Sequence, residues 1–343
     1  MIIKDICNFY LKSKIKAGEG MQEGKYPFYT SSSILSKYLD SYEIEKEGII
    51  LGTGGNASIH YCGGKFSSST DCLVMYSIND EVNNEYLYYY LLNNIHILEK
   101  GFRGAGLKHI SKKYIEDIEI KYIPDIYVQK KIVNLIKLSQ KIIYKRRKQI
   151  EELDLFVKSK FIEMFGNPIT NSKGWHREKM AYVAPIVNYT GTFNEKKIWL
   201  LNLDMVESNT GKIINYKYVM KNEINSSTCT FDTTNVLYSK LRPYLNKVVI
   251  PNSIGYATSE MVPLQPLNGK INRYYLTYML MSKVFVNYIS KKVVGTKMPR
   301  VSMNEFRNFQ VPIPPMNLQN QFADFVKQVD KLKFEIEKSL KQS

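Results

Sequence analysis

The chain of 343 residues is poor in cysteine and has no long apolar run. None of its apolar stretches approaches the roughly 20 residues that a transmembrane helix needs, so no membrane span is predicted. The N-terminal segment Met1-IIKDICNFYLKSK contains an acid and an asparagine, where a secretory signal peptide has an unbroken apolar stretch. The four cysteines include no CxxC pair, which indicates reduced thiols and a cytoplasmic protein.

Metal and cofactor motifs are also scarce. His60, Cys62 and Cys72 could offer three metal ligands, but their spacing matches no standard zinc site. The stretch Leu51-Gly52-Thr53-Gly54-Gly55 follows a predicted strand, as a phosphate-binding loop would. It is followed by Asn56-ASIHYCGG, which is typical of a turn and a second strand and not of a helix. We therefore interpret the glycines as a hairpin turn.

Two patterns typical of DNA-modifying enzymes are incomplete. Asp117-Ile-Glu119-Ile-Lys121 contains the ExK of many nucleases, but alternating polar positions on a half-buried strand explain it equally well. Pro314-Pro315 lies between Ile313 and Met316, so the Asn/Asp-Pro-Pro-aromatic motif of amino-methyltransferases is missing. A GxSxG nucleophile elbow is missing too. The sequence therefore predicts no catalytic residues, no bound cofactor and no metal site.

Acidic residues are scarce in only one part of the chain. Residues 166–314 hold 19 basic and 8 acidic residues, a net +11, within a total of +16. Residues 1–124 hold 14 and 15, a net −1; residues 125–165 hold 10 and 5, and residues 315–343 hold 5 and 4. A globular segment at +11 predicts a polyanionic partner, and nucleic acid is the leading candidate.

The first half of the chain recurs in the second half at an offset of about 190 residues. Five pairs of segments match in the same order: Ser69-Thr70-Asp71 with Thr258-Ser259-Glu260, Tyr86-LYYYLL with Tyr274-YLTYML, Ile110-Ser111 with Val301-Ser302, Ile123-Pro124 with Ile313-Pro314, and Val128-Gln129 with Leu318-Gln319. One such match could be chance, but five in order predict an internal duplication.

Two long amphipathic helices are predicted. The first begins after Pro124, with Asp125 as its N-cap, and ends at Gly166; the second begins at the N-cap Asn317. Apolar residues recur along each at a 4-3 spacing, so we expect the two to bury these faces against each other. The positions are Ile132, Ile136, Ile143, Ile150, Leu153, Val157 and Met164 in the first helix, and Phe322, Phe325, Val329, Leu332, Ile336 and Leu340 in the second.

The remaining segments are rich in short β-prone runs bounded by Gly, Asn, Asp and Pro. The predicted fold class is therefore α+β: two repeated, mainly-β globular domains separated by long helices that pair as an antiparallel coiled coil. We predict a first domain over residues 1–124, a central helical spacer over 125–166, a second domain over 167–314 and a distal helical spacer over 315–343.

Basic side chains gather in three loops. Lys100–Ile110 and Lys291–Val301 occupy equivalent positions in the repeat, and Ser239–Lys247 joins two predicted strands. Glycine lets a backbone approach phosphate closely, and arginine can bind guanine through two hydrogen bonds. A solvated surface could explain any one loop, but the recurrence favours DNA contact. The predicted DNA-binding residues are Lys100, Arg103, Lys108, His109, Lys240, Arg242, Tyr244, Lys247, Lys297 and Arg300.

The chain resembles the specificity subunits of type I restriction–modification systems over essentially its whole length. The resemblance is carried by Gly24-KYPFYTSSS, Pro124-DIYVQKKIVNLI, Arg146-RKQIEELDLFVKSKFIEMFGNP and Val311-PIPPMNLQNQF. It implies two target recognition domains, each reading one half of a split double-stranded DNA sequence. It also implies two modification subunits, which hold S-adenosylmethionine and methylate adenine, and a restriction subunit that cleaves DNA. The specificity subunit itself would catalyse nothing.

We therefore predict a DNA sequence-specificity subunit that works inside a methyltransferase or restriction complex. Two alternatives remain open at this point. One is a self-contained DNA methyltransferase or nuclease with diverged motifs, which cofactor binding by the purified chain would reveal. The other is a coiled-coil scaffold between two protein-binding domains, which would lack salt-dependent affinity for DNA.

Overall fold

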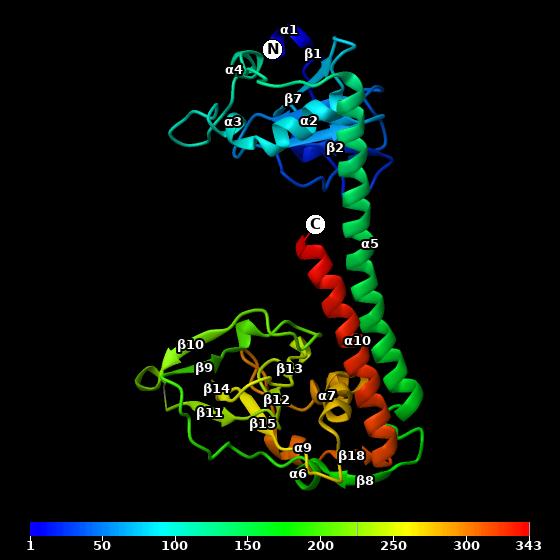
Figure 1. Ribbon diagram of the computed structural model, residues 1–343, viewed down its shortest axis with the longest axis vertical. Helices are drawn as coiled ribbons and strands as arrows, with labels where there is room; N and C mark the ends of the chain where they lie inside the picture. The colour runs from blue at the N-terminus through cyan, green and yellow to red at the C-terminus, as the bar shows by residue number, and fades with distance from the viewer. Residues whose placement is uncertain (225, 343) are drawn as a thin grey trace. The chain divides into compact units, whose positions relative to one another are not determined.

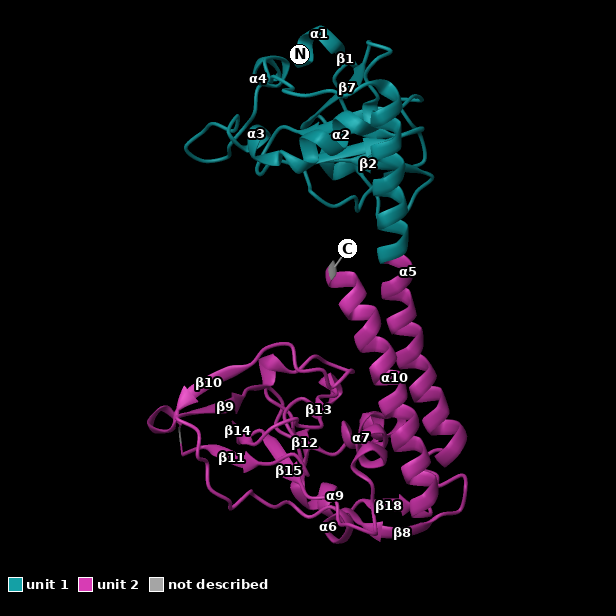
Figure 2. Ribbon diagram, in the orientation of Figure 1, with its two compact units in different colours: residues 1–143 teal, residues 144–343 magenta. Residues whose placement is uncertain are grey.

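The computed structural model describes residues 1–224 and 226–342 (Figure 1). The chain divides into two compact units, Met1–Ile143 (unit 1) and Tyr144–Ser343 (unit 2), shown in separate colours in Figure 2. The boundary falls inside the long helix α5 (Ile126–Phe165), so each unit includes part of that helix. None of the described helices is long and apolar enough to cross a membrane.

Unit 1 is built on two small sheets whose strands are short and largely buried. Its larger sheet is antiparallel and has the order β1 (Cys7–Phe9), β7 (Cys72–Ser77), β4 (Gly48–Gly52), β5 (Ile59–Cys62). The smaller has the order β3 (Tyr38–Leu39), β2 (Tyr26–Tyr29), β6 (Ser67–Ser68), with β2 and β6 parallel. The short helices are α1 (Ile3–Ile6), η1 (Ala17–Glu19), α2 (Asn84–Asn93), α3 (Ile95–Glu99) and α4 (Lys112–Glu116).

The hairpin interpretation of the glycine-rich stretch in unit 1 is confirmed. Leu51 of β4 pairs with Ile59 of β5, so residues 53–58 form the connection between two antiparallel strands. All five residues of β4 are buried, and Ile49 and Leu51 belong to a core that also contains Leu87 and Leu91 of α2. The glycines therefore serve the turn at the end of a core strand.

Unit 2 repeats this plan with additions. One sheet has the order β10 (Lys217–Met220), β9 (Lys197–Leu201), β14 (Gly255–Thr258), β11 (Thr228–Phe231), and its β9 and β14 are parallel like β2 and β6. A second has the order β13 (Val248–Val249), β12 (Val236–Ser239), β15 (Met261–Leu264). Two pairs complete the strands: β16 (Val293–Val294) with β17 (Arg300–Val301), and β8 (His176–Lys179) with β18 (Gln310–Ile313). The helices are α6 (Met180–Val183), η2 (Leu203–Met205), η3 (Lys221–Glu223), η4 (Pro243–Leu245), α7 (Arg273–Met281), α8 (Lys283–Ile289), α9 (Met303–Asn308) and α10 (Met316–Gln342).

The duplication extends to single hydrogen bonds at the start of each long helix. Gln129 and Gln319 are both fully buried, and the Oε1 of each accepts a hydrogen bond of 2.8 Å from a backbone N–H, that of Asn83 and Asn272 respectively. The Nε2 of each donates, over 2.7 Å, to the carbonyl of the proline five residues earlier. We call each of these arrangements a glutamine clamp. Since Asn83 and Asn272 cap α2 and α7, each clamp joins an aromatic helix to a long helix.

Helix α5 begins and ends as its sequence predicts. The Asp125 carboxylate accepts hydrogen bonds of 3.0 Å from the N–H groups of Tyr127 and Val128, which is the bonding pattern of an N-cap. At the other end Gly166 has φ +75°, a left-handed conformation that glycine adopts without steric cost. The predicted caps of this helix are confirmed.

The predicted N-cap of the closing helix is wrong. Helix α10 begins at Met316, and the carbonyl of Pro315 accepts hydrogen bonds from the N–H groups of Leu318 (3.0 Å) and Gln319 (3.1 Å). Asn317 therefore lies inside the first turn. Because the helix begins directly after Pro315, the Asn317 side chain lies too far along the chain to act as the N-cap.

Within unit 2 the two long helices pack antiparallel, as predicted. Their contacts run in opposite order along the two sequences: Phe161 and Phe165 meet Phe322, Phe156 meets Phe325, and Asp154 meets Lys333. The ring centroids lie 5.3–5.5 Å apart, and the ion pair measures 2.6 Å. Helix α10 lies alongside α5 in Figure 1.

The predicted apolar series is only partly correct. Val157 and Val329 are buried, but Leu332 is 56% exposed, and the most buried α5 side chains include Phe161 and Phe165, which lie outside the series. The reason is a third helix: the ring of Tyr275 in α7 lies 5.6 Å from that of Phe161 and 4.7 Å from that of Phe165. The buried faces of α5 and α10 are therefore set by a three-helix contact.

Candidate nucleic-acid interface

In unit 2, two of the predicted DNA-binding loops lie side by side. The loop Ser239–Lys247 connects β12 to β13, and the β16–β17 hairpin returns toward it. Leu241 and Arg300 form a β-bridge, and the Arg242 N–H donates to the carbonyl of Pro299 over 2.8 Å. The structure thus brings Lys240, Arg242 and Tyr244 together with Lys297 and Arg300, although the two groups are far apart in sequence.

The two equivalent loops of unit 1 also meet. The N–H and carbonyl groups of Arg103 and His109 exchange hydrogen bonds of 2.9 Å, which closes a tight hairpin, and Gly54 forms a bridge with His109. The Gly55 N–H donates to the Lys108 carbonyl over 2.9 Å. The Gly54–His109 bridge therefore corresponds to the Leu241–Arg300 bridge of unit 2. Each unit has one composite surface made of the loop after its central strand and a basic hairpin.

The predicted residues differ in how freely they face solvent. Lys247 donates from its Nζ to the Leu203 carbonyl over 2.7 Å and is half-buried, so its charge is used inside unit 2. The Arg103 guanidinium turns back onto the carbonyls of Lys100 (2.5 Å) and Phe102 (3.3 Å). Lys240 and Arg300 are half-buried as well. The exposed members are Lys100, Arg103, Lys108, His109, Arg242, Tyr244 and Lys297.

Arg300 is bound by an acid, Glu260, that is not among the predicted DNA-binding residues. Its Nε lies 3.0 and 3.1 Å from the two carboxylate oxygens of Glu260, and a terminal nitrogen lies 2.8 Å from one of them. These hydrogen bonds, with the attraction between the charges, raise the pKa of the Arg300 guanidinium. The match of Asp71 with Glu260 in the repeat was the available signal that position 260 matters.

The cysteines and His60 have structural contacts. His60 Nε2 lies 2.8 Å from the Ser32 carbonyl, and burial raises the pKa of the Cys72 and Cys229 thiols to about 11 and that of Cys7 to about 12. These thiols stay protonated near neutral pH and are poor nucleophiles. Over residues 1–224 and 226–342, no group of three or more His, Cys, Asp or Glu side chains could hold a metal ion.

The ExK stretch is explained by its packing. Ile118 and Ile120 are buried while Asp117 and Glu119 are exposed, in an extended segment that forms a single bridge between Glu119 and Ile2. The alternation is as predicted, but the pairing is one bridge and not a full strand. The two carboxylates face solvent because the isoleucines face the core.

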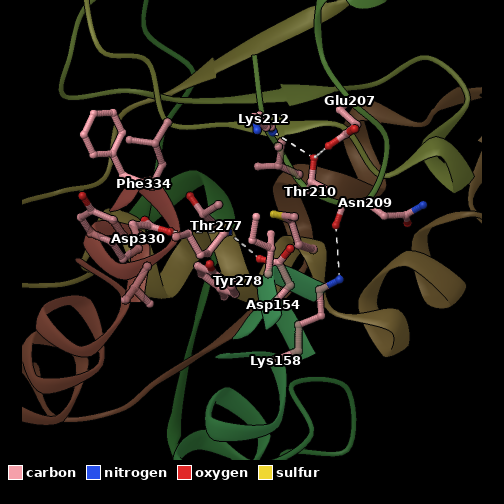
Figure 3. A pocket seen from close by; sticks show the side chains of 18 of the residues that line it. Asp154, Lys158, Glu207, Asn209, Thr210, Lys212, Thr277, Tyr278, Asp330 and Phe334 are labelled. Carbon is pink, nitrogen blue, oxygen red and sulfur yellow. Dashed lines mark hydrogen bonds and ion pairs between the residues drawn. The ribbon is translucent and has the colours of Figure 1, made fainter. Parts of the chain in front are cut away.

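A cavity of about 470 Å³ lies in unit 2 between α5, α7, α10 and the turn at 207–212 (Figure 3). Its polar side chains bond to the protein: Lys158 donates to the Asn209 carbonyl (3.4 Å), Thr210 to Glu207 (2.7 Å) and Lys212 to Glu337 (2.5 Å). Burial also raises the pKa of Asp330 in its wall. The bonds of Lys158 and Lys212 fasten α5 and α10, respectively, to the turn at 207–212.

The fold and its loop surfaces define a duplicated recognition protein, in which one scaffold occurs twice and presents two different surfaces. The family model described as the type I restriction modification DNA specificity domain matches the chain twice, over residues 1–155 and 159–343, and the chain belongs to this family. It is accordingly a DNA-specificity subunit and not a catalytic one, and the alternative of a self-contained methyltransferase or nuclease is wrong.

Two relatives agree with this assignment. The chain is 24% identical to the type I restriction enzyme EcoDI specificity subunit of Escherichia coli, over 92% of this chain and 78% of that protein. It is also 24% identical to the MjaVIII specificity subunit of Methanocaldococcus jannaschii, over 90% and 80% respectively. The resemblance found in the sequence is confirmed.

Solved structures share the fold. The S subunit of a type I restriction–modification system from M. genitalium superposes with a TM-score of 0.63 at 14% identity, covering 100% of this chain and 91% of that one. A chain from a study of complex assembly and conformational transition of the type I R-M system gives 0.61, also at 14% identity, covering 100% and 93%. At this identity the likeness shows the fold alone, with its two globular domains and long helices.

Proposed function

We propose that the chain recognises a bipartite target in double-stranded DNA, one half through each unit, and directs partner adenine methyltransferase subunits to it in the cytoplasm. The observation that carries this proposal is the repeated pairing of two loops: Gly54 with His109 in unit 1 and Leu241 with Arg300 in unit 2. An equivalent scaffold with different side chains on its loops suits a protein that reads two different half-sites.

The proposed DNA contacts in each unit are assigned from the solvent exposure of the predicted side chains. Lys100, Lys108 and Lys297 are exposed ammonium groups that suit phosphate oxygens, which fix position without reading sequence. Arg242 and His109 can reach base edges, and Tyr244 offers a ring at the same surface. Lys240 and Arg103 stand beside them. Lys247 and Arg300 contribute through the loops that they hold in place.

We infer that the chemistry lies on the partners. Neither the motifs nor the thiols of this chain suit methyl transfer, so S-adenosylmethionine belongs on the modification subunits, two of which would bind one specificity subunit. A restriction subunit would join the same complex. One chain of similar fold was solved in a study of complex assembly of the type I R-M system, which supports a role as one subunit of a larger complex.

We propose, in addition, that α5 sets the distance between the two half-sites. It is a single helix of 40 residues that contributes to both units. At about 1.5 Å per residue such a helix is roughly 60 Å long. Because a helix is stiff along its axis, its length would fix the number of unspecified base pairs in the gap.

The decisive experiment is to sequence methylated adenines in cells that carry the partner subunits, with and without this chain. Methylation at one bipartite sequence should appear only when the chain is present. The purified chain, free of partner, should neither bind S-adenosylmethionine nor methylate DNA. Methyl transfer by the chain alone, or methylation that ignores its presence, would overturn the proposal.

A further inference from the structure

We propose that Arg242 reads a guanine in the half-site recognised by unit 2, whereas Arg300 is a positioning residue that holds the reading loop in place. This inference rests on the proposed function of unit 2. It separates two arginines that the sequence alone treats alike, because both lie in basic loops of the same composite surface.

The backbone at Arg242 is unusual. Its φ is +48° and its ψ +64°, a left-handed conformation that costs energy for any residue with a Cβ. The short helix η4 follows at once, and Asn246 beyond it is left-handed too, at φ +50°. Glycine or asparagine would adopt these angles more readily than arginine. Strained backbone of this kind persists where the surroundings enforce it, and it concentrates at binding sites.

The surroundings do enforce it. The Arg242 N–H donates to the Pro299 carbonyl over 2.8 Å, and Asn246 Nδ2 donates to the Met281 carbonyl over 3.0 Å. Lys247 Nζ is bonded to the Leu203 carbonyl, and Pro243 is buried. The loop is therefore fixed near both ends, and its geometry is set before any ligand arrives. A preorganised loop loses little conformational entropy on binding.

The side chain of Arg242 is left free by this fixed loop. It is exposed, and within residues 1–224 and 226–342 its guanidinium takes part in no ion pair or hydrogen bond. Arginine presents a planar fork of donors that matches the O6 and N7 acceptors of guanine in the major groove. Lys297 is exposed on the facing hairpin and suits the backbone around that base.

Arg300 has the opposite arrangement. Its guanidinium makes three hydrogen bonds of 2.8–3.1 Å to Glu260, so the fork that would bind guanine is already occupied. The backbone around this pair is joined to the reading loop, since the Lys240 N–H donates to the Glu260 carbonyl (2.9 Å) and the Lys240 carbonyl accepts from Val301 (2.8 Å). Arg300 and Glu260 thus hold together the elements that carry Arg242.

The test compares conservative variants of Arg242, using the full chain assembled with its modification subunits and DNA randomised in the half-site of unit 2. Arg242→Asn tolerates the left-handed backbone but removes the cation, and Arg242→Lys keeps the charge but loses the planar fork. Both variants should lose discrimination at one G·C pair by about tenfold to a hundredfold. The half-site of unit 1 should be unchanged.

Two outcomes would overturn the role of Arg242. If Arg242→Lys retains the full preference at every position, the fork is not the reading group. If Arg242→Asn weakens binding equally on all sequences, with a shallower salt dependence, Arg242 contacts a phosphate. A wild-type complex with no preference in this half-site would instead overturn the proposed function of unit 2, whatever Arg242 does.

The role of Arg300 needs a charge-reversed pair. Arg300→Glu alone should weaken binding of the preferred sequence, and Arg300→Glu combined with Glu260→Arg should recover at least half of the lost discrimination, because the ion pair is restored. Thermal unfolding of each variant checks that it is folded. If folded double variants fail to recover while the single variant Arg300→Lys loses preference at one base pair, Arg300 reads that base and the positioning role is wrong.

Discussion

In unit 1 the central strand β4 runs into Gly54 and Gly55, and the facing hairpin supplies Lys108 and His109. In unit 2 the central strand β12 runs into a longer loop that presents Arg242 and the ring of Tyr244. Glycine on one side of the surface is thus replaced by arginine and tyrosine. The supporting bridge between the loop and the hairpin is the same in both units.

The two units also differ in the acidic residue at the edge of this surface, which is Asp71 in unit 1 and Glu260 in unit 2. Glu260 in unit 2 binds Arg300 through its side chain. Its counterpart Asp71 in unit 1 uses its main-chain carbonyl, which accepts from Ser31 (2.6 Å) and Thr53 (2.9 Å). Side-chain chemistry therefore varies where backbone geometry is constant. Residues 1–124 hold 14 basic and 15 acidic residues, whereas residues 166–314 hold 19 and 8. The first segment must therefore rely on a local cluster of cations for its affinity, while the second has an overall excess of positive charge.

The largest effect is expected from exchanging one surface entirely. Replacing residues 166–314 by the matching segment of a relative should change the half-site read by unit 2 completely and leave the other half-site as it was. Sequencing of methylated sites in cells measures both halves at once. A matched exchange of residues 1–124 should give the mirror result. If either exchange altered both halves, the two units could not be independent readers.

The second largest effect is expected from lengthening α5, which should change the gap between the two half-sites. Seven residues inserted after Ile143 add about 10 Å to α5, or roughly three base pairs at about 3.4 Å each, and turn the helix face by only about 20°. The aromatic and ion-pair contacts between α5 and α10 involve residues 154–165 of α5, so a single insertion leaves them intact. The gap in the methylated sequence should lengthen while both half-sites persist.

The control for that insertion is seven residues placed after Asn194, in an exposed segment of unit 2 outside the helix. It adds the same number of residues without lengthening α5, so the gap should stay as it is in the wild type. A folded variant lengthened after Ile143 that keeps the original gap would show that α5 does not set the spacing. The helix would then serve to seat partner subunits.

The two glutamine clamps allow a direct comparison of stability. Gln129→Leu and Gln319→Leu each leave the N–H of an asparagine and the carbonyl of a proline without their clamp partner, at a cost of about 1–3 kcal/mol for each unsatisfied group. Urea unfolding should show similar losses for the two variants. Gln321→Leu, at an exposed position of the same helix, should change stability by less than about 0.5 kcal/mol. Clearly unequal losses would mean that the clamps are alike in geometry only.

The smallest effect is expected from single lysines at the loop tips. Lys108→Ala and Lys297→Ala should each weaken binding about equally on every DNA sequence and reduce the slope of log affinity against log salt by about 0.9. Titrations at several salt concentrations measure this slope. Lys338→Ala in α10 is the matched control and should leave it unchanged. A changed sequence preference without a changed slope would assign the lysine to a base contact.

Local patterns allowed the long helix and the repeat to be predicted from the sequence. Asp125 and Gly166 have cap chemistry that acts within a few residues, so both ends of α5 could be identified without knowledge of the fold. The packing of the closing helix α10 was harder to predict from the sequence. Leu332 fits a two-helix apolar series but is 56% exposed, and Tyr275 of α7 instead packs against Phe161 and Phe165, which lie outside that series.

The surface was predictable as a region but not as a set of roles. Recurrence marked the basic loops of both halves, whereas the pairing of Arg300 with Glu260 spans 40 residues and depends on how β15 and β17 approach each other. The left-handed backbone of Arg242 is equally hidden, because arginine gives no local signal for it. Burial and hydrogen bonding between distant segments decide which cations remain available.

The glutamine clamps also bear on how new specificities arise. Gln129 and Gln319 present the same hydrogen-bonding socket at the start of each long helix, and their partners are main-chain groups outside the DNA-facing loops. Genetic recombination within the short stretch that encodes either helix start would join a foreign recognition segment to an intact socket. The hybrid would keep these main-chain hydrogen bonds, so a lineage could replace half of its DNA target in one exchange while its methylation machinery stays the same.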